Sequence, residues 1–440
     1  MLLEFRTKNY KSFVDEMCFS MIPAAKQKGL DYSILAMQGG SKTYQGLCSV
    51  VIYGPNASGK TNLIGAMETF RTIVLRGNIR NADLNSANTA ASALELIPNC
   101  NGVSAPTEFS IRFVDDGIIV EYSLKVDLGQ FLAKDDGRRI LEERLSVNEK
   151  LIFQRGDSLT VELPTTIKGY VNKGIKRKTR KMQEIAEGSL EDTELFLNNG
   201  FKLIFAQALV RKILDWFSNK FIVIYHSEDP RVARRLADPK DNTVYVEKTL
   251  TEAAREFGIT ANALGYKASN EKEGEDAILY SVLRDKALPA EIFESYGTIR
   301  FINEFPLVIY ALVNGGTLIM DEFDASIHSM ALMNIINIFH NDDINKNCAQ
   351  LVFNTHNPIF LDESLLRRDE IKFVERNEET GNSEHYALSD FRTADGIRKG
   401  EDYMNNYLVG RYGAIKNVDF ALILEKVIQQ KEVFSDEGFQ

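Results

Sequence analysis

The sequence predicts an α/β fold: a parallel sheet carries a phosphate-binding loop, and an antiparallel β-meander lobe and a helical insertion are added to it. Three observations lead to this prediction. A buried, β-branched strand at 48–53 is followed by a glycine-rich loop and a helical pattern. Residues 108–153 alternate with a period of two, which is typical of antiparallel strands. Two more apolar strands, at 317–321 and 349–354, are predicted after a long segment with helical spacing.

The composition excludes several classes of protein. The chain has 440 residues, 44% hydrophobic and 26% charged, which is ordinary for a globular protein and excludes a disordered chain or a collagen-like fibre. A net charge of -10 makes the whole chain a poor binder of polyanions. The cysteines lack Cys-x-x-Cys spacing, so a zinc or redox site is not predicted. No signal peptide is visible, and the most apolar segment, 305–320, is interrupted by Pro306, so we expect a cytoplasmic protein without a membrane partner.

The first part of the chain contains most of the predicted strands. Residues 1–24 alternate as edge strands do, and the polar, glycine-rich segment 25–46 is predicted to be a loop. A helix is predicted over 61–75, and an exposed connection over 80–105. The period-two segment 108–153 is interrupted by Asp-Asp-Gly at 115–117 and at 135–137, which predicts an antiparallel meander with turns at these places.

The middle of the chain changes character. Helices are predicted over 199–218, 248–257 and 276–286, so the segment is interpreted as a helical insertion. Helices at 297–313 and 325–340 then alternate with the two late strands. The predicted organisation is therefore an N-terminal part at 1–160, a helical insertion at 161–290 and a C-terminal part at 291–440.

A phosphate-binding motif follows the strand at 48–53. It fits G-x-x-x-x-G-K-[ST]. Such a loop wraps backbone N–H groups around phosphate oxygens, and the helix that follows favours an anion at its N-terminus. The lysine adds a positive charge and the threonine hydroxyl can ligate Mg²⁺. We therefore predict nucleotide binding by Gly54, Pro55, Asn56, Ala57, Ser58, Gly59, Lys60, Thr61 and the following Asn62.

Polar residues follow the two late strands. Asp321 and Glu322 end the first one, where Asp321 is predicted to hold Mg²⁺ and Glu322 to polarise an attacking water. His356 follows the second strand at the same edge of the sheet, where it is predicted to contact the γ-phosphate. A strand-end carboxylate pair or a single histidine is often structural, but the phosphate loop upstream favours the functional interpretation.

These pieces resemble an ABC-type ATPase head. More specifically, the chain resembles stand-alone bacterial AAA-type ATPases related to OLD and SMC heads. The matching segments are Asn9–Phe13, Asp321–His328, Thr355–Asn357, Arg367–Asp369 and Tyr407–Ile415. The resemblance implies ATP hydrolysis, with Lys60, Glu322 and His356 as catalytic residues, and implies a signature segment at 294–298 in which Ser295 and Gly297 contact nucleotide. The Q-loop glutamine stays open between Gln130 and Gln154.

Family members occur in anti-phage and abortive-infection systems. The resemblance therefore implies a homo-oligomer, with two heads packed head-to-tail around two ATP molecules, that controls a separate effector such as a nuclease or toxin. The alternative is a DNA repair or chromosome-maintenance ATPase that acts directly on DNA. A built-in nuclease is not predicted, because the chain has no Asp-x-Asp pair.

One segment, 168–181, concentrates basic residues in an acidic chain. It is interpreted either as a solvated loop or as a surface that binds nucleic acid or an acidic partner.

Overall fold

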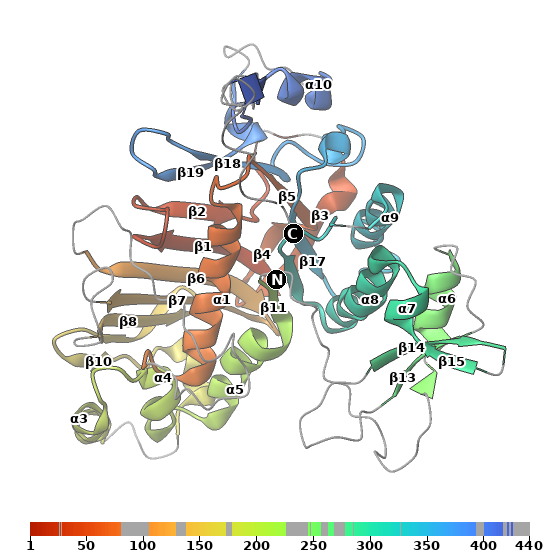
Figure 1. Ribbon diagram of the computed structural model, residues 1–440. Coiled ribbons are helices and arrows are strands. Elements are labelled where there is room, and N and C mark those ends of the chain that lie inside the picture. The colour runs from red at the N-terminus through yellow and green to blue at the C-terminus, as the bar shows by residue number, and fades with distance from the viewer. Residues whose placement is uncertain are drawn as a thin grey trace, which may run out of the picture.

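The structure is a computed structural model. It describes residues 1–80, 105–128, 138–172, 178–225, 245–256, 263–267, 278–392 and 400–416, except 26, 28, 247, 285 and 326, together with 420, 421, 424 and 425. Two large sheets organise these residues, and helix α1 (Lys60–Arg76) lies between them (Figure 1).

The first sheet has six described strands, and all but the last are parallel. In spatial order they are β11 (Phe221–Ile224), β16 (Thr317–Met320), β17 (Gln350–Asn354), β5 (Ser49–Tyr53), β18 (Ile371–Arg376) and β19 (Ser383–Ala387). The four residues of β16 and the five residues each of β17 and β5 are fully buried, as expected of parallel strands covered on both faces. Because β17 lies between β5 and β16, the ends of all three strands meet at one edge of the sheet.

The second sheet is the predicted antiparallel meander. Its strands, in spatial order, are β10 (Leu159–Val161), β9 (Lys150–Arg155), β8 (Arg139–Val147), β7 (Ile118–Asp127), β6 (Thr107–Asp115), β1 (Leu2–Lys8) and β2 (Met17–Ser20). Alternate residues of these strands face α1, and Phe70 of α1 packs against Phe5, Phe109 and Tyr122. The turn at 115–117 joins β6 to β7 as predicted, whereas the turn at 135–137 lies outside the described residues.

Helices cover the other face of the parallel sheet. They are α8 (Tyr296–Asn314), α9 (Ser329–Phe339) and α10 (Tyr403–Leu408), close to the predicted helices at 297–313 and 325–340. Gly315 ends α8 in a left-handed conformation with φ of 69°, a backbone geometry that glycine adopts without a steric penalty. The predicted α/β class, with a parallel sheet that carries the loop and an antiparallel meander, is confirmed by this topology.

The prediction that the segment 161–290 is helical is wrong in two respects. First, β11 belongs to the parallel sheet, where it pairs with β16. Second, a four-stranded antiparallel sheet replaces the helix predicted over 276–286. It contains β12 (Tyr245–Val246), β13 (Ala263–Lys267), β14 (Ile278–Leu283) and β15 (Lys286–Pro289). Short apolar runs do not distinguish strand from helix, which explains the error. The limits at 160 and 290 stay a prediction.

The helical part of this segment packs into the main core. Its helices and short turns are η2 (Thr165–Tyr170), α3 (Thr179–Ser189), α4 (Phe196–Asn199), η4 (Phe201–Leu203), α5 (Gln207–Asp215) and η5 (Trp216–Lys220). The ring of Trp216 stacks on Phe113 of the meander with centroids 3.7 Å apart. Further along, α6 (Lys248–Glu256) and α7 (Ala290–Phe293) lie beside the small sheet (Figure 1).

The polar segment 25–46 is not the loop that its composition predicts. It contains the short helix η1 (Asp31–Ser33) and a hairpin of β3 (Ile34–Gly39) and β4 (Lys42–Leu47). Leu35 and Leu47 of this hairpin are buried, so tertiary packing outweighs the local polarity. The connection predicted over 80–105 lies almost entirely outside the described residues.

Candidate active site

The phosphate loop connects β5 to α1, as predicted. Gly54 begins it, and a Cβ at this position would lie 2.3 Å from the backbone oxygen of Val374 on the neighbouring strand. Gly59 has a φ of 112°, which side chains other than glycine rarely adopt. Ala57 also has a positive φ, 62°, at the exposed tip beside Asn56. The loop therefore wraps tightly because two of its residues have no side chain.

Lys60 lies inside the loop and is buried. Its Nζ donates hydrogen bonds to the carbonyl oxygens of Gly54, at 2.8 Å, and Pro55, at 2.9 Å. Burial lowers the pKa of Lys60 to about 8, while the carboxylates of Asp321, Glu322 and Asp324 act in the opposite direction. A buried ammonium group with a lowered pKa gains stability from an anion placed beside it, as a phosphate would be.

An unpartnered hydroxyl also points to an anionic ligand. Ser58 Oγ is buried and has no hydrogen-bond partner among the described residues. Buried hydroxyls are almost always hydrogen-bonded in folded proteins, so an orphan in this loop is consistent with a bound group that supplies the partner. The residues present therefore fit a nucleotide phosphate.

A hydroxyl and a carboxylate meet across the edge of the sheet. Thr61 Oγ1, in the first turn of α1, donates to Asp321 Oδ1 at 3.3 Å. Asp321 is buried at the end of β16, and Asn354 at the end of β17 donates to the same carboxylate oxygen at 2.5 Å. Oxygen ligands of this kind suit Mg²⁺, which takes one or two protein groups and fills its other positions with water and phosphate. The fold thus brings Thr61 and Asp321, the two predicted Mg²⁺ ligands, into contact although they are 260 residues apart in the sequence.

Glu322 has an unusual backbone. Its φ is 53°, in the left-handed region that residues other than glycine seldom occupy. Its N–H donates to Asn354 Oδ1, and its carbonyl accepts from Arg300 Nη2 at 2.7 Å. The carboxylate itself is exposed and has no hydrogen bond or ion pair among the described residues. The backbone is therefore held firmly, while the side chain stays available.

His356 reaches the same edge of the sheet after β17, as predicted. The pKa of His356 is lowered, first by partial loss of water around the ring and second by the positive charge of Lys60. The negative charges of Asp324 and Glu322 oppose this shift. These interactions place His356 within electrostatic range of the phosphate loop. The neighbouring Thr355 hydroxyl donates to Asp324 at 2.5 Å, which ties the ends of β16 and β17 together.

For three residues that support the site, no such role was predicted from the sequence. Ser383, at the start of β19, donates to the backbone oxygen of Ser58 at 2.5 Å, and Ser12 accepts from Asn62 at 2.8 Å. Asn354 is the third. The sequence could have indicated this residue, because it is a polar residue at the buried end of an apolar strand, like Asp321. Ser383 had no such signal, because the strand that carries it lies 325 residues after Ser58.

The predicted signature segment lies at the start of α8. Ser295 is the N-cap residue of this helix, and its Oγ accepts from the backbone N–H of Thr298 at 3.2 Å. Among the described residues, no hydrogen bond or ion pair joins Ser295 or Gly297 to the phosphate loop of the same chain. The structure therefore brings Lys60, Thr61, Asp321, Glu322 and His356 together and leaves the signature residues apart.

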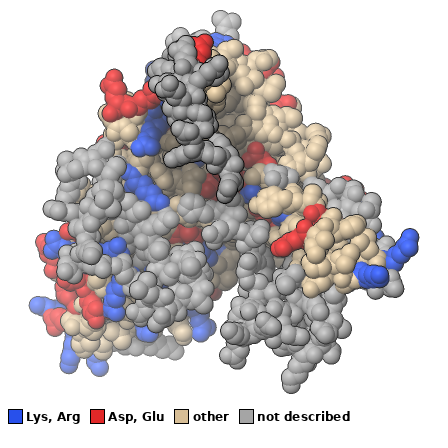
Figure 2. Space-filling model, viewed as in Figure 1, with Lys and Arg blue, Asp and Glu red and all other residues tan. Residues whose placement is uncertain are grey.

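The basic segment 168–181, for which nucleic-acid binding is one prediction, lies partly on the described surface. Of the basic segment 168–181, residues 173–177 lie outside the described residues, while Lys168, Lys178, Arg180 and Lys181 are described and exposed. Arg180 pairs with Glu184 on α3 at 3.3 Å. Figure 2 shows described basic and acidic atoms interspersed around this part of the molecule.

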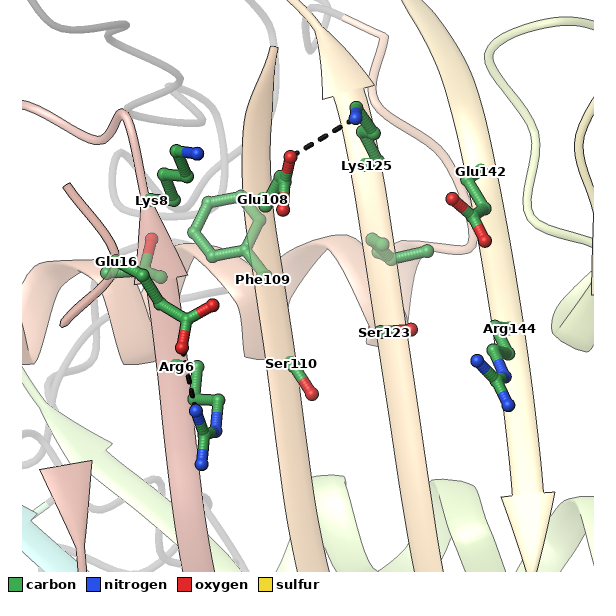
Figure 3. A pocket seen from close by; sticks show the side chains of 12 residues that line it. Arg6, Lys8, Glu16, Glu108, Phe109, Ser110, Ser123, Lys125, Glu142 and Arg144 are labelled. Atoms are coloured by element: carbon green, nitrogen blue, oxygen red, sulfur yellow. Dashed lines mark hydrogen bonds and ion pairs between the residues drawn. The ribbon is translucent and has the colours of Figure 1, made fainter. Parts of the chain in front are cut away.

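A hollow of about 170 Å³ lies on the outer face of the meander, opposite α1 (Figure 3). In its middle row, Arg6 and Arg144 stand at either end of two small serines, Ser110 and Ser123, which explains why the surface is depressed there. The next row alternates in charge through Lys8, Glu108, Lys125 and Glu142. Alternation of this kind differs from the continuous basic surface that binds phosphate backbones.

No described helix combines the length and the apolar character needed to cross a bilayer.

Comparison with solved structures finds SMC heads with low similarity. An SMC head bound to the C-winged helix domain of ScpA has 13% identity and a TM-score of 0.38, and the match covers 90% of this chain and 99% of that chain. An SMC head domain from Thermotoga maritima has 11% identity and a TM-score of 0.34, with 88% and 98% covered. An SMC head with an extended coiled coil, bound to the C-terminal domain of ScpA and derived from Pyrococcus furiosus, has 12% identity and a TM-score of 0.36, with 88% and 97% covered.

No curated protein sequence matches the chain. A protein-family model does match, over residues 49–362, and its description is "AAA domain, putative AbiEii toxin, Type IV TA system". This match covers more than half of the chain and includes the phosphate loop, the segment at 294–298, the acidic strand end and His356. The chain therefore belongs to this family of AAA-domain ATPases.

Proposed function

We propose that the protein binds and hydrolyses ATP at the edge of the parallel sheet where β5, β16 and β17 end. One observation carries the proposal: Thr61, at the end of the phosphate loop, donates to Asp321 at the end of β16 at 3.3 Å, and His356 follows the neighbouring strand β17 at the same edge of the sheet. Phosphoryl transfer requires mainly positioning and charge stabilisation, which is what this arrangement supplies.

The loop residues hold the substrate. The backbone of residues 54–61 surrounds the phosphates of ATP, Ser58 supplies a hydroxyl, and Lys60 neutralises the β- and γ-phosphates. Thr61 and Asp321 would hold Mg²⁺, which would supply positive charge to stabilise the phosphates. Ser295 and Gly297 of a second copy supply the contacts that the loop lacks, so that two heads pack head-to-tail around two ATP molecules.

Glu322 orients and activates the attacking water. Its carboxylate is exposed at the sheet edge and free to accept a proton from water, as a general base must be. His356 contacts the γ-phosphate from the adjacent strand. The His356 ring carries an N–H in either protonation state, so it can donate a hydrogen bond to a phosphate oxygen.

Phosphate release and nucleotide binding test this proposal. We expect Lys60→Ala to abolish ATP binding, because the buried positive charge of the loop is lost. Glu322→Gln is expected to bind ATP normally and to hydrolyse it at least about a hundredfold more slowly, because the amide cannot accept the proton. Lys150→Ala and Glu121→Gln, at exposed positions of the meander, are the matched controls. Full hydrolysis by the Glu322→Gln protein would contradict the assignment.

The biological role proposed for this ATPase is anti-phage defence. ATP binding and hydrolysis switch the association of two heads and thereby control a separate effector, such as a nuclease or toxin. The description of the family, which names a "putative AbiEii toxin" and a Type IV toxin–antitoxin system, supports the proposed role in defence.

A plating assay separates this role from the alternative of DNA maintenance. Cells that carry the gene with its neighbours are challenged with phages, and loss of protection is expected in the Lys60→Ala strain. Recovery of a bound effector protein from infected cells is expected as well. Unchanged plaque numbers together with sensitivity to DNA damage in a deletion strain would instead support a DNA repair or chromosome-maintenance ATPase. The alternating charges of the meander face do not favour that alternative.

A further inference from the structure

We infer that Arg300 is a positioning residue for Glu322, and that it holds the backbone of this glutamate in the orientation that hydrolysis requires. The inference rests on the proposed function, since it assigns Glu322 to the activation of water. The backbone of Glu322 is in an unfavourable conformation and yet is held on both sides.

The conformation of Glu322 requires support. A non-glycine residue with a φ of 53° is in a strained conformation, which persists only where the surroundings fix it. Here the N–H of Glu322 donates to Asn354, and its carbonyl accepts from the N–H of Ala325 at 3.0 Å and from Arg300 Nη2 at 2.7 Å. Two side chains from different elements thus clamp one peptide segment.

No contact within the described residues holds the side chain of Glu322 in place. It has no hydrogen bond or ion pair within the part of the chain that the structure describes. Within the described residues, the backbone is therefore the part of Glu322 that is held in place, and it sets where the side chain begins. A displacement of about 1 Å at a reacting group can cost about a hundredfold in rate, so the support of this backbone bears directly on hydrolysis.

Arg300 is well suited to provide this support. It lies in α8, is 3% exposed, and its Nε donates to Glu304 Oε1 at 2.8 Å. Glu304 is likewise 2% exposed, so the two charges compensate each other away from water. The planar guanidinium then presents Nη2 to the carbonyl of Glu322 in a fixed direction. The same helix begins at Ser295, so α8 joins the signature segment to the acidic strand end.

A simpler view is that Arg300 and Glu304 only stabilise the fold. A double substitution separates the two views, because replacing both members of a buried ion pair by apolar residues is often neutral or even stabilising. The variant Arg300→Met with Glu304→Leu removes the pair without leaving a charge behind, and it also removes the hydrogen bond to Glu322. Arg300→Gln with Glu304→Gln is a second variant, which keeps a neutral polar pair. The glutamine at 300 is too short to donate both to residue 304 and to the carbonyl of Glu322.

A matched control exists at the opposite edge of the sheet. Arg367 is buried, pairs with Asp369 at 2.9 Å, and donates to a backbone carbonyl, that of Gly29, at 2.7 Å. This arrangement precedes β18 and lies far from the strand ends that carry the site. Arg367→Met with Asp369→Leu therefore controls for the loss of a buried ion pair that holds a backbone carbonyl.

The experiment measures thermal unfolding, ATP affinity and kcat for all of these proteins. We expect the Arg300 double variants to keep the wild-type ATP affinity and a Tm near the wild type, while kcat falls at least about tenfold. The control double variant is expected to keep kcat. Wild-type kcat in either folded Arg300 double variant overturns the inference and leaves the proposed function intact. A wild-type protein that binds no ATP, or that binds it without hydrolysis, overturns the proposed function and the inference with it.

Discussion

His385 is a half-buried histidine in the hairpin of β18 and β19, and its ring lies beside Phe19 with centroids 5.7 Å apart. Burial, and to a lesser extent the charge of Lys372, lower its pKa to about 3. An unfolded chain binds this proton below about pH 6.5, while the folded protein does not bind it until pH 3 is approached. The free energy of unfolding therefore falls as the pH is lowered from 6.5 towards 3.

We expect His385→Phe to make the stability less dependent on pH in this range. The aromatic ring can pack against Phe19 but has no proton to bind, so up to about 1.4 kcal/mol per pH unit is removed from the slope. Urea unfolding at pH 7, 6 and 5 measures the difference from wild type. His328→Asn, at the exposed N-cap of α9, is the control. Equal slopes for wild type and His385→Phe would show that the folded protein does not hold this histidine in its neutral form.

At the scale of elements, Glu143 fastens α4 to the meander. This carboxylate lies on β8, is fully buried, and accepts hydrogen bonds from the backbone N–H groups of Phe196, at 2.7 Å, and Leu197, at 3.0 Å. Tyr122 on β7 donates its hydroxyl to the same group at 2.8 Å. Burial raises the pKa of Glu143, and these three donors act against the shift. One side chain thus joins the segment after residue 161 to the N-terminal part of the chain.

We expect Glu143→Leu to destabilise the protein by about 2–4 kcal/mol, because two buried N–H groups and a hydroxyl lose their acceptor. Glu142→Leu is the matched control, since this neighbour lies on the outer face of the same strand, and its cost is expected to stay below about 1 kcal/mol. The midpoint of urea unfolding gives both values. A small effect of Glu143→Leu would mean that α4 is not packed on the meander in solution.

The whole molecule is expected to work as a pair of heads. Ser295 and Gly297 lie at the exposed start of α8 and make no hydrogen bond or ion pair with the phosphate loop within the described residues, which is consistent with a complete site built from two chains. The exposed apolar side chains of Ile292 and Tyr296 flank this helix start. Apolar surface beside the signature segment suits a protein partner more than water.

Mixing two inactive variants tests the composite site. Lys60→Ala lacks a working loop, and Ser295→Arg blocks the signature segment. A head-to-tail pair of the two contains one intact site, so we expect the mixture to recover ATP hydrolysis that neither variant shows alone. Light scattering is expected to show a dimer for Glu322→Gln with ATP and a smaller species without it. A mixture as inactive as its components, with each variant folded, would contradict the two-chain site.

The sequence by itself determined the features that are recognised from a few neighbouring residues. These are the loop at 54–61, the strand ends at Asp321 and His356, and the period-two meander. Their chemistry is encoded within a few residues, because loop geometry and strand burial follow local pattern. Only the tertiary structure decided that β11 joins the parallel sheet, that 25–46 contains a hairpin, and that Arg300 reaches Glu322. These features arise from contacts between segments that are remote or ambiguous in local pattern, where packing outweighs propensity. For that reason the candidate site could be proposed from the sequence, while the residues that support its backbone could not.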